Sequence, residues 1–341
     1  MRFASAGTLA AVLDMPDRER IASLPTPLES YDRLTAAWGG PTIWFKRDDR
    51  TGFGLSGNKV RKLEFHVVAA RAAGADLLMT CGAVQSNHCR ATALVAARLG
   101  LGCVLFLRSP GGASPGRPEG NHLLARLAGA EVRFVDQDWW DDRHDHMAVA
   151  ARELQNAGRS SWVIPEGASD ALGMWGYVQA GVEAAEQLKA KGVERPIHWH
   201  ASSSGGTTAG LAAYAALSGD RGEVVAISVS DPVTGLTRRI ETIWDEAFEG
   251  LDLRPGMGRI ELRDDYIGRG YGLATPQELA VQHEATSLTG LIFDPAYTGK
   301  ALYALRCEID KGRFSRDDNV VLWHTGGGFA ALAFDYGDLF D

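Results

Sequence analysis

Cysteine, long apolar runs and excess positive charge are all scarce in this sequence. The four cysteines among 341 residues form no CxxC pair and no metal-ligand spacing, so neither a disulfide framework nor a metal site is expected. Cysteine that is so sparse and unpaired favours a reducing compartment, the cytoplasm. No apolar run approaches the ~18–20 residues of a membrane helix. A net charge of −8 argues against a nucleic-acid partner, which would require a basic surface.

The first 19 residues also lack the basic region and long apolar stretch of a signal peptide. Glycine, in contrast, is abundant: 40 residues, where average usage would give about 24. Neither repeats nor excess proline accompany it, so we expect many tight turns and close backbone approaches. Hydrophobic residues at 45% and charged residues at 23% are typical of a globular protein with a substantial core.

Short apolar runs alternate with Ala-rich helical patterns along most of the chain. The expected strands are Thr42–Phe45, Leu77–Cys81, Cys103–Leu107, Val132–Val135, Trp162–Ile164, Ile197–Ala201, Val224–Val229 and Val320–His324. The clearest helical patterns are Lys62–Ala73, Ala91–Leu99, Gly120–Leu127 and Tyr177–Lys191. Apolar strands separated by helices indicate parallel sheets covered on both faces, so the predicted class is α/β with two doubly wound, open parallel-sheet domains.

The domain division is drawn from the strand series. The strands between residues 77 and 135 form one compact set with short loops, and a second series begins near Trp162. We expect a smaller domain over 59–163 and a larger one built from 1–58 and 164–341. Asp136–His146 is expected to be a polar, aromatic break, and Arg254–Pro276 an irregular functional loop.

Gly52–Gly57 matches the GxGxxG pattern of dinucleotide-binding folds. That fingerprint should grow directly out of an apolar strand, and its acidic residue should close the next strand. Here four charged residues precede the loop, and Asp76 precedes its strand instead of ending it. A nicotinamide site is therefore the weaker interpretation, and a Walker-type phosphate loop also fails because Gly57-Asn58-Lys59 lacks the Gly-Lys-Ser/Thr sequence.

Lys59 follows this glycine-rich loop and begins a helical pattern with two further basic residues. They could form a solvated basic face, but a lysine placed here could also reach a cleft, where a desolvated amine can form a Schiff base. Further on, Ser86 and Asn87 follow a strand and open a helix. One interpretation is that they simply cap the helix. The other is that they bind an anion together with the free backbone N–H groups of the helix N-terminus. His88 and Cys89 are adjacent and point apart on a helix, so no metal site is expected.

A third loop has the composition of a phosphate cradle. Ser202–Leu211 (SSSGGTTAGL) follows a strand and begins an Ala-rich helix, so small residues, hydroxyls and a helix N-terminus meet there. Tyr271 lies between two glycines, Tyr297 lies in DPAYTGK, and Thr325 follows the last strand. One lysine after a glycine loop and one phosphate cradle, with no metal or dinucleotide site, suggest pyridoxal 5'-phosphate.

The segments SGNKVRKLEF, GAVQSNHCR, SSSGGTTAGL, DPAYTGKA and LWHTGG occur in this order. With them the chain resembles the D-cysteine desulfhydrase and 1-aminocyclopropane-1-carboxylate deaminase family, from about Leu24 to Tyr336. These are pyridoxal-phosphate enzymes of the tryptophan-synthase-β-like fold, fold type II. The resemblance implies an enzyme that acts on a small amino acid. We expect it to be a homodimer in the cytoplasm, and its charge and short apolar runs predict no nucleic-acid or membrane partner.

The resemblance also implies roles for single residues. Lys59 would form the Schiff base and remove the α-proton, Asn58 would support it, Ser86 would hold the substrate carboxylate, and Asn87 would bond the cofactor's ring hydroxyl. Tyr271 and Tyr297 match the two tyrosines that face the substrate. The phosphate would be bound by a loop that departs from the family's usual Gly-Ser-Ala-Gly-Thr: Ser203, Ser204, Gly205, Gly206 and Thr207.

Thr298 and Thr325 distinguish the branches of this family. The cyclopropane deaminases carry Glu directly after the tyrosine of DPxY, where this chain has Thr298, and Thr325 is expected to contact the pyridine nitrogen. A neutral hydroxyl leaves that nitrogen unprotonated and the ring a weaker electron sink. This pattern resembles the β-eliminating branch, which would convert D-cysteine to pyruvate, sulfide and ammonia.

Two other activities stay open, as does a homologue that binds the cofactor without catalysis. One is the cyclopropane deaminase; the other is cysteate sulfo-lyase, for which His88, Arg90 and Arg269 are conceivable cationic contacts. Departures from the family pattern include Ala91 and Ala296. A second group matches no motif of the family and has no assigned role: Trp139, Trp140, His144 and His146.

Overall fold

The computed structural model describes residues 15–220, 222–250 and 255–340. Most of the leading segment inspected for a targeting signal therefore lies outside the described residues, as does Arg254. Among the helices that are described, none is long and apolar enough to cross a membrane.

Ten strands and the helices between them make up the described chain. The strands are β1 (Leu28–Ser30), β2 (Thr42–Lys46), β3 (Leu77–Ala83), β4 (Gly102–Arg108), β5 (Glu131–Val135), β6 (Ser161–Val163), β7 (Pro196–Ser202), β8 (Glu223–Ser228), β9 (Ile260–Arg263) and β10 (Asn319–Trp323). The α-helices are α2 (Asp32–Trp38), α3 (Lys59–Ala72), α4 (Asn87–Leu99), α5 (Gly120–Leu127), α6 (Gln137–Asp141), α7 (Arg143–Asn156), α8 (Trp175–Ala190), α9 (Gly206–Ser218), α10 (Val233–Ala247), α11 (Pro276–Thr289), α12 (Thr298–Asp310) and α13 (Gly328–Ala331). Short 3-10 turns lie at Asp48–Arg50, Pro110–Gly112, Glu166–Ala168 and Gly337–Phe340.

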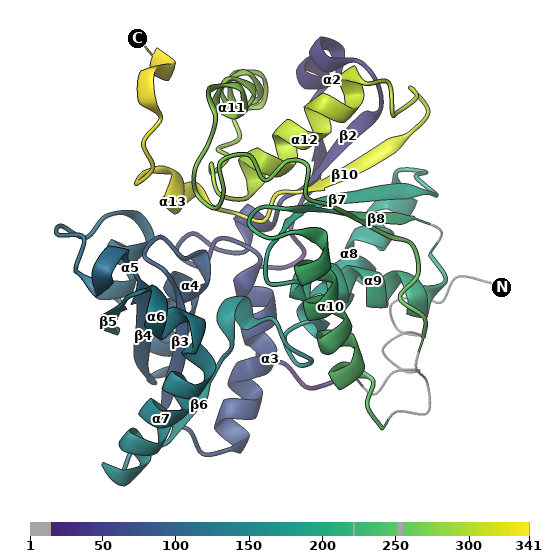
Figure 1. Cartoon of the computed structure of the whole chain (residues 1–341). Coiled ribbons are helices and arrows are strands. Elements are labelled where there is room, and N and C mark those ends of the chain that lie inside the picture. Colours follow the sequence, from purple (N-terminus) through teal and green to yellow (C-terminus); the bar gives the residue numbers. More distant parts are fainter. Residues whose placement is uncertain (1–14, 221, 251–254, 341) are drawn as a thin grey trace.

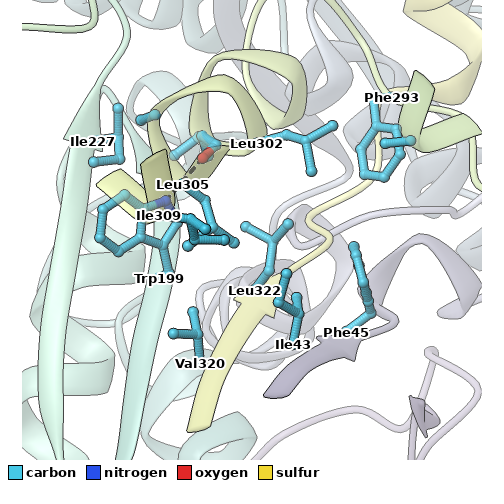
Figure 2. Packing of buried hydrophobic residues seen from close by; sticks show 14 of the residues in the cluster. Ile43, Phe45, Trp199, Ile227, Phe293, Leu302, Leu305, Ile309, Val320 and Leu322 are labelled. Carbon is cyan, nitrogen blue, oxygen red and sulfur yellow. Dashed lines mark hydrogen bonds between the residues drawn. The ribbon is translucent and has the colours of Figure 1, made fainter. Parts of the chain in front are cut away.

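The larger sheet has six strands in the order β1-β2-β10-β7-β8-β9. All neighbouring strands are parallel except β1, which pairs antiparallel with β2. One face packs against α2, α11 and α12 through a core that contains Ile43, Trp199 and Leu302 (Figure 2). The other face packs against α8 and α9, with α10 beyond them. This is a doubly wound sheet, as the sequence predicts.

The smaller sheet has four parallel strands in the order β5-β4-β3-β6. Helices α3, α4 and α5 cover one face, and α6 and α7 cover the other. In Figure 1 the two sheets occupy separate halves of the molecule, and α3 runs between them. The two-sheet α/β class is thus confirmed, whereas the residue bounds of the two domains stay a prediction.

Two regions differ from the expectations. Asp136–His146 is not a break, because it forms α6 and begins α7; the Asp136 side chain caps α6 by accepting from the backbone N–H of Trp139 at 2.9 Å. The region 254–276 is not wholly irregular, because β9 forms the half-buried edge of the larger sheet. Short β1 was also not foreseen.

The loops that carry the expected site residues follow the carboxyl ends of parallel strands. The loops after β7 and β10 come from the larger sheet, and those after β3 and β4 from the smaller one. Ligands of open α/β sheets bind in the crevice at these strand ends. A ligand site is therefore expected where the two sets of loops meet.

Candidate active site

A cavity of about 860 Å³ lies between the strand ends of the two sheets. It is lined by every site residue expected from the sequence except Gly206, the first residue of α9. Residues separated by more than 200 positions in the sequence, such as Lys59 and Thr325, thus share one cavity.

Lys59 is the first residue of α3 and reaches the cavity. Its Nζ lies 3.4 Å from the carbonyl oxygen of Gly167. Burial lowers the pKa of Lys59 to about 8, because desolvation disfavours the ammonium form, although Glu166 and Cys89 act in the opposite direction. A lysine with a pKa near neutrality supplies the neutral amine that attacks a carbonyl.

The other two basic residues of this helix turn are buried, so the solvated basic face is excluded. Arg61 pairs with Asp48 at 2.8 Å and Glu183 at 2.9 Å, and Tyr177 donates to Asp48 at 2.6 Å. Lys62 is fully buried and donates to Ser169 Oγ at 2.9 Å. These contacts fix the first turn of α3 and hence the direction in which Lys59 points.

Asn58 connects the lysine to the other loops of the cavity. Its backbone N–H donates to the carbonyl of Thr325 at 3.1 Å, and its side-chain nitrogen donates to Thr207 Oγ1 at 3.2 Å. Gly57 has φ +112°, and a Cβ on it would lie 2.9 Å from the carbonyl oxygen of Thr325. Only glycine allows the two backbones to approach so closely.

Ser86 caps α4, because its Oγ accepts from the backbone N–H of Cys89 at 3.1 Å. The plain capping interpretation therefore holds, and Ser86 also lines the cavity beside the free N–H groups of this helix N-terminus. Asn87 accepts from Asn121 Nδ2 at 2.9 Å through its Oδ1. With its oxygen engaged, the Asn87 amide nitrogen is the group left to donate into the cavity.

The loop from Ser203 to Thr207 follows β7 and leads into α9. Gly205 has φ +86°, and Gly206 begins the helix, where backbone N–H groups and the helix dipole favour an anion. Ser204 Oγ lies 2.7 Å from Ser169 Oγ, and a Cβ on Gly206 would lie 2.7 Å from the same Ser169 oxygen. A cradle with hydroxyls, no Cβ at its base and the buried Lys62 side chain beside it fits a phosphate.

Tyr271 and Tyr297 lie edge to face, with ring centroids 5.4 Å apart and an interplanar angle of 80°. Desolvation raises the pKa of both phenols, and the hydrogen bond between them lowers that of Tyr271 and raises that of Tyr297. Both therefore keep their protons at neutral pH. This pair offers the cavity a protonated hydroxyl.

Thr325 lines the cavity, but Thr298, the other residue that distinguishes the branches, does not. Thr298 begins α12, and its hydroxyl donates to Asp294 Oδ1 at 2.6 Å. Desolvation raises the pKa of Asp294, which is fully buried. Neither position presents a carboxylate to the cavity.

Glu166, Gly167 and Ser169 also line the cavity, although no motif in the sequence points to them. They lie in and directly after the 3-10 turn Glu166–Ala168 that follows β6, where Gly167 has φ +72° and Ala168 has φ +48°. A non-glycine residue with a positive φ is uncommon and is found at functional sites. That strain cannot be read from the sequence PEGAS, which resembles an ordinary loop.

Of the three residues expected as cationic contacts for a sulfonate, His88 lines the cavity, whereas Arg90 and Arg269 do not. His88 shares a hydrogen bond with Thr80 at 2.8 Å, and burial lowers its pKa, so its ring is neutral. Arg90 donates to the carbonyls of Gly54 and Ser56 and holds that loop in place. Arg269 is exposed and does not line the cavity. Within the described chain, no group of three His, Cys, Asp or Glu side chains could hold a metal ion.

Comparison with known proteins agrees with this geometry. A D-cysteine desulfhydrase of Yersinia enterocolitica is 39% identical over 311 residues, which are 91% of this chain and 93% of that protein. One of Klebsiella pneumoniae is 37% identical over 319 residues, 93% and 96% of the two chains. A crystal structure described as an ACC deaminase homologue superposes with a TM-score of 0.86 at 33% identity and covers 97% of each chain.

The family model described as pyridoxal-phosphate dependent enzyme matches residues 20–326, which include every part of the cavity described above. The cofactor and the fold type expected from the sequence are thereby confirmed. The chain belongs to the pyridoxal-phosphate-dependent enzymes.

Proposed function

We propose that this protein is a β-eliminating lyase that converts D-cysteine and water to pyruvate, sulfide and ammonia. The observation that carries the proposal is the lowered pKa of Lys59 in a cavity that also contains a phosphate cradle and presents no carboxylate at Thr298 or Thr325. The relatives named D-cysteine desulfhydrase over more than nine-tenths of the chain support the substrate.

Different residues of the cavity would bind different parts of the cofactor. The Ser203–Thr207 loop would hold its phosphate, Lys59 would hold its aldehyde carbon, and Asn87 would donate to its ring hydroxyl. Thr325 would lie against its ring nitrogen. Bound pyridoxal phosphate supplies an electron-accepting ring conjugated to the substrate nitrogen.

The remaining steps belong to protein side chains. The N-terminus of α4 and Ser86 would bind the substrate carboxylate, which orients Cα toward Lys59. Lys59, as a neutral amine, would remove the α-proton. The pair Tyr271 and Tyr297, protonated at neutral pH, would donate to the departing sulfur.

Sulfide and pyruvate measured together test this function. Cofactor-loaded protein given D-cysteine should release the two in equal amounts, and Lys59→Ala should lose both the visible absorption of the bound cofactor and the activity. L-Cysteine in parallel reports the stereochemical preference. A loaded, yellow protein that releases neither product from either enantiomer would show a binding homologue and not a lyase.

The two alternative activities produce different products. 2-Oxobutyrate from 1-aminocyclopropane-1-carboxylate would identify a deaminase, and sulfite from cysteate would identify a sulfo-lyase. The structure favours neither, because Thr298 is engaged with Asp294 and the three expected cationic residues do not face the cavity as cations.

We further propose that the enzyme is a homodimer in the cytoplasm. Cys81, Cys89 and Cys103 are buried free thiols, which suit a reducing compartment. Light scattering at micromolar concentration tests the dimer, and fractionation of the producing cells tests the compartment.

A further inference from the structure

The segment with no assigned role, Asp136–His146, has two faces. Trp139 stacks on Phe106 with centroids 4.6 Å apart and also packs on His146, whose Nδ1 lies 3.1 Å from the Trp139 carbonyl oxygen. These residues attach α6 and α7 to the smaller sheet. Trp140 and His144, in contrast, line the cavity.

Trp140 is nearly buried, and two arginines lie against its ring. The guanidinium carbon of Arg108 is 4.8 Å from the ring centroid, and that of Arg143 is 5.0 Å away. Both arginines line the same cavity as Lys59. We define the group Arg108, Trp140, Arg143 and His144 as the distal cluster.

The position of Arg108 follows from the register of the smaller sheet. It is the last residue of β4 and pairs with Ala83, the last residue of β3, and β3 leads directly to Ser86. Neighbouring strands are about 4.8 Å apart. The distal cluster therefore begins one strand away from the loop expected to bind the substrate carboxylate.

The donors of the distal cluster are largely unused. Arg108 donates to Gln137 Oε1 at 3.2 Å and pairs with no carboxylate among the described residues. Arg143 donates to the carbonyl of Trp140 at 3.0 Å; its Nε is buried without a hydrogen-bond partner there, and Glu166 lies 3.7 Å from it. Since a guanidinium has five N–H donors, most remain available on each arginine.

Two more arginines line the cavity, both on α10: Arg238 donates to the carbonyl of Thr234 at 3.3 Å, and Arg239, beside Gly205, forms an ion pair with Asp231 at 2.8 Å. Lys59 is reserved for the cofactor. The phosphate cradle lies at the start of α9, where Gly205 is next to Arg239, and it belongs to a different element from the distal cluster. An anion bound by Arg108 and Arg143 would therefore belong to the substrate and not to the cofactor.

We propose that the distal cluster is a subsite for an anionic group at the end of the substrate's β-substituent. This inference rests on the proposed function and extends its substrate class to cysteine S-conjugates that bear a carboxylate. A planar carboxylate accepts paired N–H donors from a guanidinium, and the indole holds both guanidinium groups in place.

The reaction on such a conjugate balances without another reactant. For S-carboxymethylcysteine, the α-proton leaves, the Cβ–S bond breaks with its electron pair on sulfur, and the sulfur takes up a proton. One water then hydrolyses the remaining fragment. The products are mercaptoacetate, pyruvate and ammonia.

A matched pair of substrates tests the subsite. S-Carboxymethylcysteine and its neutral isostere S-carbamoylmethylcysteine, both as D-enantiomers, form the first pair and differ in charge. S-Carboxyethylcysteine and S-carbamoylethylcysteine form a second pair, in which the terminal group lies one methylene further from the sulfur. The kcat/KM for pyruvate release should favour the carboxylate about tenfold to a hundredfold in at least one pair, the range for a hydrogen bond to a charged group. Arg143→Gln and Arg108→Gln should each reduce that ratio, and Arg133→Gln should leave it unchanged.

Arg133 is a matched control because it also lies against an aromatic ring, Phe106, at 5.5 Å but does not line the cavity. Equal kcat/KM for carboxylate and amide in both pairs would overturn the subsite, as would a preference that both variants retain. If D-cysteine and all four conjugates yield no pyruvate, the proposed function fails instead. Calorimetric binding of the same pairs to cofactor-loaded protein then tests the subsite alone, and equal affinities would overturn it.

Discussion

The low pKa of Lys59 makes the loading of its cofactor depend on pH in a defined way. Loading requires the neutral amine. With a pKa of about 8 in place of 10.5, about one molecule in ten carries that form at pH 7, whereas the ordinary value would give about one in three thousand. Burial therefore increases the reactive fraction roughly 300-fold at pH 7.

The assay is the rate at which apoenzyme gains visible absorption after mixing with pyridoxal phosphate, measured from pH 6 to 10. The rate should rise with pH and level off around a midpoint near 8. Glu166 stabilises the ammonium form, so Glu166→Gln should move the midpoint to lower pH. Glu153→Gln, which removes an exposed carboxylate of α7, should not move it.

A rate that continues to rise toward pH 10.5 would refute the argument, because the amine would then behave as if it were in water. A Glu166→Gln midpoint that is unchanged or higher would refute the part assigned to Glu166. The first result would overturn the reasoning from burial and the second the electrostatic effect of Glu166, but neither would change the identity of the lysine.

Three further predictions concern stability and the phosphate loop. Gly206→Ala should weaken cofactor binding, measured by fluorescence titration, because its Cβ would lie 2.7 Å from Ser169 Oγ, whereas Gly235→Ala meets nothing within 4 Å and should not. Below pH 8, Lys59→Met apoenzyme should unfold at higher denaturant than wild type, with a free energy of unfolding larger by up to about 3 kcal/mol. This difference should vanish as pH rises to 10.5, because the unfolded wild type binds more protons than the folded protein in that interval and the wild type gains stability there. Asp48→Asn should cost about 1.5–3 kcal/mol by the same measurement, since the buried Arg61 loses one of its two carboxylate partners and keeps Glu183.

Eight of the ten described strands were predictable because buried parallel strands are apolar throughout. Helices α6 and α7 were not, because Asp136–His146 is rich in charge and its helix start depends on one aspartate cap. Strand β9 was missed for a related reason: it is a half-buried edge with alternating charge, and only its pairing with β8 makes it a strand.

The candidate site divides in the same way. The loops after β3, β7 and β10 carry local signals, a helix start or a Ser/Gly run, and these lie where the sequence predicts. Arg108, Arg143 and Glu166 carry none, because an arginine at the end of a strand or on a helix is ordinary until a second element faces it. Their proximity depends on the register of β3 with β4 and on the turn after β6, which are tertiary facts.

The glycine excess is explained best where the two halves of the site meet. Gly57 precedes α3, which packs on the smaller sheet, and Gly326 follows β10 of the larger sheet. A Cβ on Gly326 would lie 2.7 Å from the Cα of Gly57, and both residues have φ above +100°. No side chain fits between the two backbones, so Lys59 and Thr325 are held at a separation that main-chain contact determines. A larger residue at either position would separate the amine from the loop expected to contact the ring, and it would do so without altering any residue that touches substrate.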